Sequence, residues 1–382
     1  MLSSPILLDY QSSTPCHQEV VDAMKPYWNQ IFGNPSSKSN LAGISSSAAL
    51  EVSREKIIQK LNLKNQKIIF TSGATEANNL ALLGYARNFH TRTGSFGNII
   101  TLKTEHHAVL EPIRQLAKEG FTITEISPQE NGLINQEILL KAIKKDTFLV
   151  SIMLANNEIG VIQPVNDIAQ ICKSRKIIFH TDAAQCIGYL PLNLISRNAN
   201  MITLSSHKIY GPKGVGLLII DEEINLEPLL FGGGQEFGFR PGTIPLPLII
   251  GFAKAIEIAI SNTEKNISKL SILRNNLLKG ILKNGNKVLI NGSMNHRLPH
   301  NLNITFLDLS GSRLHKELKS KIICSSGSAC SNGMPSHVLM ALGRSLKESE
   351  SSLRLSLGIQ TSHDDINKAI MIINNVVQAL SK

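Results

Sequence analysis

Between residues 50 and 220 the chain alternates short apolar runs with amphipathic stretches. This alternation is typical of a parallel sheet covered by helices. Several runs are apolar at successive positions, which favours strands buried on both faces. The predicted strands are residues 68–70, 98–102, 148–154, 177–180, 201–204 and 216–220, and the predicted helices between them include 111–118, 135–143 and 165–175.

The pattern changes after the three glycines at 232–234. A long helix is predicted over 248–259, and the next strand signal, 302–307, lies between Pro299 and Gly311. A chain of 382 residues is long for one domain core, so the change indicates a second, smaller domain.

Composition is that of an ordinary globular protein, with 42% hydrophobic and 18% charged residues. The net charge of +10 suits an anionic partner, but the basic residues are spread along the chain. Short clusters such as Lys141, Lys144 and Lys145 have the spacing of a solvated helix face. Direct nucleic-acid binding is therefore not predicted as the main role.

Five cysteines, an odd number, lack the density of a secreted disulfide scaffold and favour a reducing compartment. The first residues contain no basic region of a signal peptide, and no run of about 18 apolar residues predicts a membrane span. We expect a soluble, cytoplasmic protein.

Polar residues follow the predicted strands, where ligands gather in parallel sheets. Residues 71–76 join a strand to a helix start near Thr75, which predicts either a phosphate cradle or an ordinary cap. Asp182 follows another strand, and its carboxylate either holds a cation such as a protonated pyridine nitrogen or caps the next helix.

Lys208 follows the strand at 201–204 and opens into a glycine-rich stretch. A lysine there can form a Schiff base if its pKa is lowered, and Ser205 and His207 beside it can donate hydrogen bonds to a phosphate. A surface lysine is the alternative interpretation, so the assignment depends on the neighbouring residues.

Cys330 lies in a loop of small residues, 325–333, with almost nothing apolar around it. That setting favours an exposed, reactive thiol over a buried one. Cys172 and Cys186 are instead interpreted as small buried hydrophobic residues. Cys324 follows Ile322 and Ile323, and we interpret it as a strand residue rather than a resolving thiol.

At this point the residues match a known family. The chain resembles the cysteine desulfurases, within the class V aminotransferase group of pyridoxal-phosphate enzymes, over nearly its whole length. The shared stretches are residues 8–10, 32–37, 71–76, 104–106, 156–160, 205–214 and 325–330.

The resemblance implies an α/β, fold type I pyridoxal-phosphate-dependent transferase. Its large domain, residues 15–255, would hold a mostly parallel seven-stranded sheet. Residues 1–14 and 256–382 would form a smaller α+β domain that carries the mobile cysteine loop. The resemblance further implies a homodimer with its active site at the subunit interface.

The resemblance also assigns roles to single residues. It implies that Lys208 binds pyridoxal 5'-phosphate, that Asp182 pairs with the pyridine nitrogen, and that His106 stacks on the ring and shuttles protons. It implies phosphate contacts from Ala74, Thr75, Ser205 and His207, and from Thr243 of the neighbouring subunit. Asn157 and Gln185 would contact the ring's edge and phenolic oxygen, and Asn34, Asn157 and Arg354 would bind the substrate.

The implied reaction converts L-cysteine to L-alanine and leaves a persulfide on Cys330. The loop sequence resembles the branch that passes sulfur to an iron-sulfur scaffold protein or to tRNA-thiolation proteins. In that branch the same cysteine also serves, as a secondary role, as a metal ligand of a nascent cluster shared with the scaffold. The alternatives are a selenocysteine lyase or cysteine β-lyase on the same fold, and a non-enzymatic scaffold that binds protein or RNA.

Four positions depart from the family pattern: Asn40 where a histidine is common, Ser206 for a glycine, Phe237 for an arginine and Pro241 for a small residue. None removes a catalytic group, but they bear on the dimer contact that would deliver Thr243. The loop after Cys330 also looks shorter than in the longest-loop members.

Overall fold

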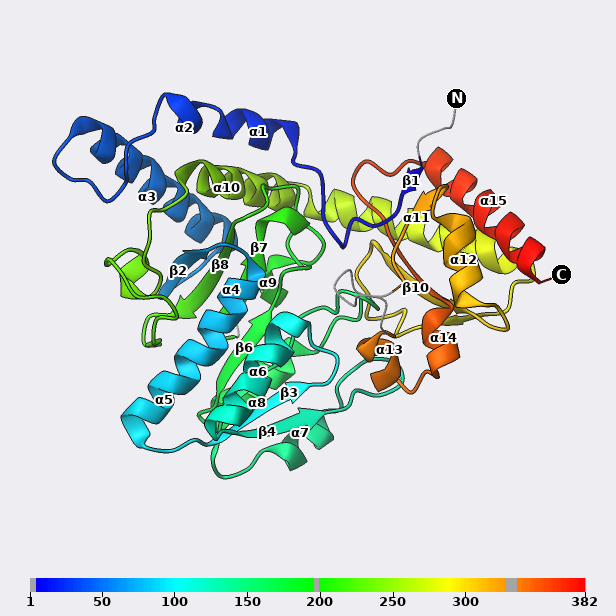
Figure 1. The fold of residues 1–382 in the computed structure, drawn as a ribbon, viewed down its shortest axis with the longest axis horizontal. Helices are drawn as coiled ribbons and strands as arrows, with labels where there is room; N and C mark the ends of the chain where they lie inside the picture. The colour runs from blue at the N-terminus through cyan, green and yellow to red at the C-terminus, as the bar shows by residue number, and fades with distance from the viewer. Residues whose placement is uncertain (1–4, 196–198, 327–334, 382) are drawn as a thin grey trace.

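The computed structural model describes residues 5–195, 199–326 and 335–381, and its centre is a seven-stranded sheet (Figure 1). The strand order is β2-β8-β7-β6-β5-β3-β4. The strands are β2 Gln66–Thr71, β3 Asn98–Leu102, β4 Thr122–Ile126, β5 Thr147–Ser151, β6 Ile178–Asp182, β7 Met201–Ser205 and β8 Gly216–Asp221. Only β8 runs antiparallel to its neighbours, β2 and β7, so the mostly parallel seven-stranded sheet is confirmed.

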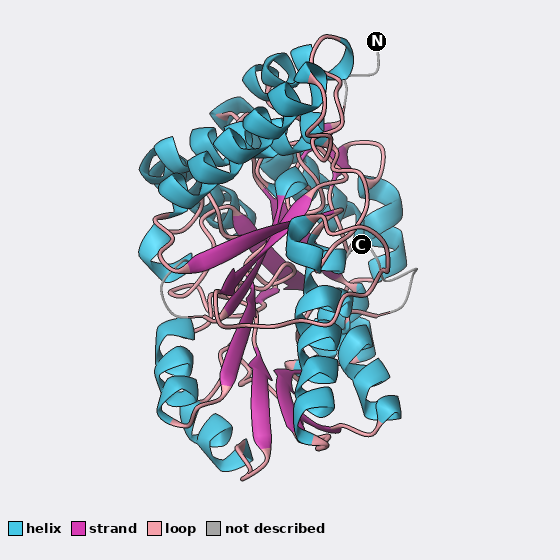
Figure 2. Ribbon diagram, turned by 90° about the vertical axis from the view of Figure 1, so that its left-hand side faces the viewer, coloured by secondary structure: helices cyan, strands magenta, loops and turns pink. Residues whose placement is uncertain are grey.

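Successive residues of these strands point to opposite faces and enter two different cores. Ile68 and Phe70 belong to a core that also contains side chains of helices α3 Leu41–Leu61, α7 Gln136–Ala142, α8 Val165–Ser174 and α10 Leu246–Ser261. Ile69 belongs instead to a core with side chains of α4 Ala74–Asn79, the π-helical turn Leu80–Gly84, α5 Tyr85–Thr93 and α6 His107–Glu119. Helices thus cover both faces, as Figure 2 shows, which explains the continuous apolar runs in the sequence.

A second layer forms around a three-stranded antiparallel sheet of order β12-β10-β9. Its strands are β9 Val288–Ile290, β10 Asn301–Phe306 and β12 Ser352–Ser356. The helices of this region are α11 Thr263–Lys283, α12 Gly311–Leu318, α13 His337–Ala341, α14 Leu346–Glu350 and α15 His363–Leu380. Strand β1 Ile6–Leu7 pairs in parallel with β11 Ile322–Ile323, so the N-terminal segment joins this part of the molecule.

The remaining helices are α1 Gln18–Met24, α2 Pro26–Asn29 and α9 Leu192–Ile195, with 3-10 turns at Ser206–Lys208 and Glu236–Gly238. Asn40, one of the departures from the family pattern, caps α3 by accepting a hydrogen bond from Gly43 N at 2.8 Å. Within the described ranges, no single helix is long and apolar enough to cross a membrane; only α10 and α11 together, bent by 68°, reach that length and hydropathy.

The six predicted strands and the predicted helices are all present, with ends that shift by up to four residues. Strand β4 was not predicted, because at the sheet edge its residues are largely exposed or half-buried. The predicted domain boundary after residue 255 falls inside α10, whereas the chain bends at Asn262. The division into 15–255 and the remainder stays a prediction.

A buried ion pair fastens α3 to the loop before α10. Arg54 Nη2 donates to Glu236 Oε1 at 2.8 Å, and Arg54 Nη1 donates to Ile68 O. The other carboxylate oxygen of Glu236 accepts from Phe70 N at 2.8 Å. Glu236 therefore ties the helix to the edge strand β2.

We expect Glu236→Gln to lower the free energy of unfolding by about 3–5 kcal/mol, because it leaves the buried Arg54 charge uncompensated. Urea unfolding at fixed protein concentration measures the change. The matched control is Glu111→Gln, which breaks an exposed pair with Arg114 of 2.5 Å and should cost at most about 1 kcal/mol. Equal losses in both variants would contradict the assignment.

Candidate active site

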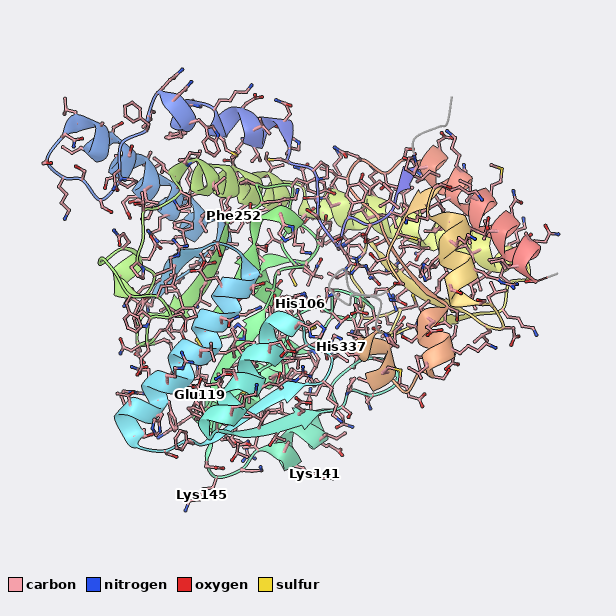
Figure 3. The ribbon with its side chains drawn as sticks, in the orientation of Figure 1. His106, Glu119, Lys141, Lys145, Phe252 and His337 are labelled. Atoms are coloured by element: carbon pink, nitrogen blue, oxygen red, sulfur yellow. The ribbon has the colours of Figure 1, made fainter. Side chains whose placement is uncertain are left out.

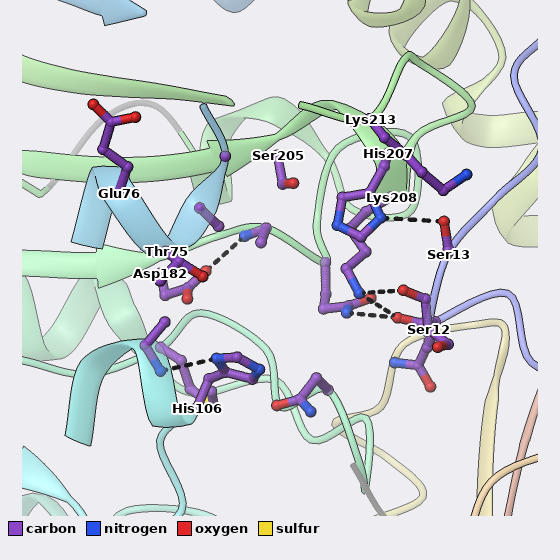
Figure 4. A pocket seen from close by; sticks show the side chains of 18 of the residues that line it. Ser12, Ser13, Thr75, Glu76, His106, Asp182, Ser205, His207, Lys208 and Lys213 are labelled. Atoms are coloured by element: carbon purple, nitrogen blue, oxygen red, sulfur yellow. Dashed lines mark hydrogen bonds between the residues drawn. The ribbon is translucent and has the colours of Figure 1, made fainter. Parts of the chain in front are cut away.

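A cavity of about 490 Å³ opens at the carboxyl ends of the parallel strands (Figure 4). Residues from both parts of the molecule line it. They include Gln11, Ser12, Ser13, Gly73, Ala74, Thr75, Glu76, His106, Met153, Asn157, Asp182, Gln185, Ser205, His207, Lys208, Lys213 and Arg354. Nine of the predicted cofactor contacts thus lie around one space, namely every one except Thr243.

Lys208 enters this cavity from the 3-10 turn that follows β7. Its Nζ donates to Gln11 O at 2.7 Å and to Ser12 O at 2.8 Å. The next turn holds Tyr210 at φ 63°, a left-handed conformation that is strained for a bulky residue. Tyr210 OH accepts from Ile359 N at 2.8 Å, which helps to hold that turn. Lys208 therefore lines the cavity with defined hydrogen-bond partners and is not a surface lysine.

Asp182 is the last residue of β6, next to β7 in the sheet. Its two carboxylate oxygens accept hydrogen bonds from Ala184 N at 2.9 Å and Asn78 Nδ2 at 2.7 Å. Residues 184–189 form turns, so Asp182 does not cap a helix. The carboxylate is buried, held at the cavity wall, and suited to a cationic partner.

His106 caps helix α6 and faces the same cavity. Its Nδ1 accepts from Ala108 N at 3.0 Å, so the neutral ring carries its hydrogen on Nε2. Burial lowers the pKa of His106; the negative charge of Asp182 opposes this lowering and the positive charge of Lys208 adds to it. The site therefore favours the neutral ring, whose Nε2–H can donate a hydrogen bond into the cavity.

The start of α4 and the end of β7 form the other end of the cavity. Gly73, Ala74 and Thr75 line it at the helix start, where backbone N–H groups favour an anion. Ser205 Oγ is buried and makes no hydrogen bond within the described part of the chain. A Cβ on Gly73 would meet no described atom within 4 Å, so this end is open enough for a phosphate.

His207 lies beside this end, with Nδ1 3.2 Å from Ser13 Oγ. Burial, together with the positive charges of Lys208 and Lys213, lowers the pKa of His207 to about 4. At neutral pH the ring is uncharged and retains one N–H. These groups fit pyridoxal phosphate: an amine for its aldehyde, an acid for its ring nitrogen, and unsatisfied donors for its phosphate.

Arg354, in β12, closes the cavity from the smaller sheet. It is 1% exposed, and its Nη1 donates to Asn157 O at 3.0 Å. Its Nη2 donates to Asp9 Oδ1 at 2.7 Å and to Ser325 Oγ at 3.0 Å. Two residues predicted to bind substrate, Asn157 and Arg354, thus lie together.

Two predicted contacts are not brought to this cavity by the single chain. Asn34 is exposed between α2 and α3 and accepts from Ser36 N at 2.9 Å. Thr243 is also exposed, and neither belongs to the described lining. Their roles stay predictions, including the contact that Thr243 would make from a second subunit.

Cys330 lies outside the described residues, so its roles as sulfur carrier and metal ligand stay predictions. The described residues on both sides of it are tied to the site. Ser325 contacts Arg354, and Ser336 Oγ donates to Glu158 Oε2 at 2.5 Å. His337 Nε2 lies 2.9 Å from the backbone oxygen of Glu105. Glu105 directly precedes His106, and Figure 3 labels His106 and His337.

Two further cysteines agree with their predicted burial. Cys172 and Cys186 are buried. Cys324 was predicted as a strand residue, but β11 ends one residue before it. Burial and the charge of Asp9, opposed by Arg354, raise the pKa of Cys324 to about 12, which favours a protonated thiol over a resolving one. Among the residues described, no group of three or more His, Cys, Asp or Glu side chains is placed to hold a metal ion.

Sequence reasoning missed Gln11, Ser12 and Ser13, whose carbonyls and hydroxyl contact Lys208 and His207. Their only signal was the shared stretch at residues 8–10 immediately before them. Asn78, which holds Asp182, was also missed, although it follows Thr75 by three residues and so lies on the same helix face.

Fold and cavity together fit an α/β enzyme in which a lysine is placed to hold a phosphate-bearing aldehyde cofactor. The family model for class-V aminotransferases matches residues 6–369. The chain is 42% identical over 383 residues to the cysteine desulfurase IscS of Neisseria meningitidis, covering 99% of this chain and 94% of that protein. The chain therefore belongs to the class-V aminotransferase family and, within it, to the cysteine desulfurases.

Two solved structures are similar to it over most of their length. A NifS-like protein superposes with a TM-score of 0.89 at 33% identity, covering 99% of both chains. A structure described as SspA in complex with cysteine gives a TM-score of 0.79 at 34% identity, covering 92% of this chain and 98% of that one. The α/β, fold type I architecture and the dependence on pyridoxal phosphate are thus confirmed.

Behind Asp182 on the same strand, His180 is buried between Ser151 Oγ at 2.8 Å and Thr203 Oγ1 at 3.2 Å. Burial lowers the pKa of His180 to about 3. An unfolded histidine titrates near 6.5, so between these two values the unfolded chain binds one proton more than the folded chain. The contribution of neutral His180 to the free energy of unfolding is therefore complete above pH 6.5 and is lost as the pH falls toward 3.

We therefore expect the free energy of unfolding to depend less steeply on pH in His180→Asn than in the wild type. The difference should approach, but not exceed, about 1.4 kcal/mol per pH unit between pH 6 and pH 4. Urea unfolding at several pH values measures both slopes. Parallel slopes would show that His180 does not stay neutral in the folded protein.

Proposed function

We propose that this protein is a pyridoxal-phosphate-dependent cysteine desulfurase that converts L-cysteine to L-alanine and carries the sulfur as a persulfide on Cys330. The observation that supports it most is the pairing of Lys208 and Asp182 at the ends of adjacent strands, in one cavity with Arg354. Arginine suits an amino-acid carboxylate because its planar fork offers parallel donors.

The cofactor's parts match distinct groups of the cavity. Lys208 would bind its aldehyde carbon, and Asp182 would keep its pyridine nitrogen protonated. Gly73, Ala74, Thr75, Ser205 and His207 would hold its phosphate, with His106 against the ring and Asn157 and Gln185 at its edge and phenolic oxygen. When bound, pyridoxal phosphate supplies an electron sink that stabilises negative charge developing on the substrate carbon.

The chain's own residues divide the remaining work. Arg354 orients the substrate through its carboxylate, and Lys208 Nζ takes the Cα proton after leaving the Gln11 and Ser12 carbonyls. The Cys330 thiolate attacks the substrate sulfur; an S–S bond forms, the C–S bond breaks, and its electron pair stays with carbon. Two protons complete alanine: Lys208 returns the one that it took from Cα, and the substrate thiol's own proton passes to the carbon that carried the sulfur. His106, neutral in the resting site, can take this second proton and then give it up.

The proposal predicts one persulfide on Cys330 for each enzyme incubated with L-cysteine without reductant. Mass spectrometry of the peptide that contains Cys330 should show a gain of one sulfur, and alanine should form in step with it. Cys330→Ala should lose the persulfide and at least about 99% of the alanine turnover with a thiol acceptor, because the nucleophile is absent.

Two variants serve as controls for this experiment. Cys324→Ser removes a cysteine six residues before Cys330 and should keep both signals. Lys208→Ala should lose both, together with the absorbance of covalently bound cofactor. If Cys330→Ala released sulfide and no alanine at the wild-type rate, a β-lyase would replace the desulfurase; preference for selenocysteine over cysteine would indicate a selenocysteine lyase.

The sulfur acceptors belong to the same proposal. The loop sequence around Cys330 supports direct transfer to an iron-sulfur scaffold protein or to a tRNA-thiolation protein, in the cytoplasm. A cluster shared with such a scaffold would make Cys330 a metal ligand as a secondary role.

A homodimer is the final part of the proposal. Large apolar side chains are exposed on α2, on the segment that joins it to α3, at the start of α3 and on the loop before Glu236. They include Trp28 at 61%, Phe32 at 73%, Leu41 at 84% and Phe231 at 89%. Figure 1 places α2 and the start of α3 at the end of the molecule far from the C-terminus. A second copy covering them would bring the exposed Thr243 to its neighbour's phosphate site.

We expect Leu41→Glu combined with Phe231→Glu to yield a monomer with strongly reduced activity, because the interface would then bury two unpaired carboxylates. Sedimentation velocity gives the oligomeric state. Met371→Glu replaces an equally apolar side chain, 58% exposed on α15, and should leave the dimer and its activity unchanged. A fully active, dimeric double variant would exclude this face as the interface.

A further inference from the structure

The donors of the Arg354 guanidinium are already largely occupied. Nη1 donates to Asn157 O at 3.0 Å, while Nη2 donates to both Asp9 Oδ1 and Ser325 Oγ, at 2.7 and 3.0 Å. Nε is buried and makes no hydrogen bond within the described residues. Both hydrogens of Nη2 are therefore in use, whereas Nε and the second hydrogen of Nη1 are left for a ligand.

This occupancy limits how a carboxylate can bind. A carboxylate that binds an arginine with two parallel hydrogen bonds uses either the Nε and Nη2 edge or the Nη1 and Nη2 edge. Nη2 belongs to both edges. Binding of that kind therefore requires Nη2 to give up Asp9 or Ser325.

The two contacts differ in the cost of breaking them. Asp9 and Arg354 form a buried ion pair, with side chains 14% and 2% exposed, and separating it would leave charges uncompensated. The Ser325 hydroxyl is neutral, and it also donates to Asp9 Oδ2 at 3.0 Å. Ser325 keeps its hydrogen bond to Asp9 when it loses the one from Nη2. The contact between Arg354 Nη2 and the Ser325 hydroxyl is therefore the one that breaks when a carboxylate binds.

The backbone holds Asp9 in position independently of the ligand. Asp9 forms a β-bridge with Ser356, two residues after Arg354 on β12. The strand β1 before it pairs with β11, which leads into Ser325. The three side chains thus come from three neighbouring backbone segments of one small sheet region.

We propose that Asp9 is a positioning residue of the substrate site, which holds Arg354 ready for the α-carboxylate of the amino acid, and that this carboxylate replaces the Ser325 hydroxyl at Nη2. The proposal rests on the proposed function in one respect, namely that Arg354 binds the substrate carboxylate. Asp9 then acts on substrate affinity through Arg354 and touches no reacting atom.

The test compares two ligands on the cofactor-loaded protein by calorimetric titration. S-methyl-L-cysteine retains the carboxylate but has no thiol to transfer, and its methyl ester lacks the carboxylate charge. Asp9→Asn keeps the shape and removes the charge. We expect it to weaken binding of the acid at least about tenfold and binding of the ester less than about twofold.

Ser325→Ala provides an independent arm. Removing the group that must be displaced should tighten binding of the acid by about 2- to 10-fold, as the loss of one competing hydrogen bond predicts. Asp364→Asn is the matched control: it neutralises an exposed carboxylate paired with Lys368 at 2.6 Å and should change neither affinity. In turnover, Asp9→Asn should raise KM for L-cysteine and leave kcat nearly unchanged.

Unchanged or tighter binding of the acid by Asp9→Asn would overturn the positioning role, and so would equal weakening of acid and ester. Weaker binding of the acid by Ser325→Ala would overturn the displacement. If Asp9→Asn fails to fold, Ser325→Ala decides alone, and only tighter binding supports the proposal. Because the thioether cannot transfer sulfur, these outcomes are separate from a failure of the wild type to form alanine and persulfide.

Discussion

A single buried carboxylate, Asp182, organises the electrostatics of this protein. It is held at the end of β6 by Ala184 N and Asn78 Nδ2, which satisfy both oxygens without neutralising the charge. Burial is the main cause that raises the pKa of Glu105 and of Cys186, and the Asp182 charge raises both further. Glu105 and Cys186 thus favour their uncharged forms, so that the negative charge of Asp182 acts on whatever binds beside it.

The N-terminal segment connects that wall to the rest of the site. Between residues 9 and 14 it supplies the carboxylate that pairs with Arg354, two carbonyls that accept from Lys208, and Thr14, which donates to His207 O at 2.9 Å. The same segment begins as β1, paired with β11 in the smaller part of the molecule. Lys208 and Arg354 are about 150 residues apart in sequence. Residues 9–14, which are distant from both in sequence, therefore fix their positions relative to each other.

The strand pattern explains why much of this could be predicted. Strands buried on both faces have continuous apolar runs, and ligands lie at their carboxyl ends, so Thr75, Asp182 and Lys208 were identifiable as the polar residues that follow such runs. Strand β4 was missed because an edge strand exposes half of its side chains. The N-terminal contacts to Lys208 were missed because they are made by backbone carbonyls, which no residue type reveals.

By itself, the sequence determined the α/β class, the polar residues that follow the central strands, and the family. Periodicity and local motifs depend only on residues that are neighbours in the chain. Only the tertiary structure decided which alternatives hold. Asp182 does not cap a helix, Lys208 is not on the surface, and Arg354 already carries an ion pair with Asp9. Each of these depends on groups that meet only when distant segments pack together, since burial and hydrogen bonding are properties of the folded chain.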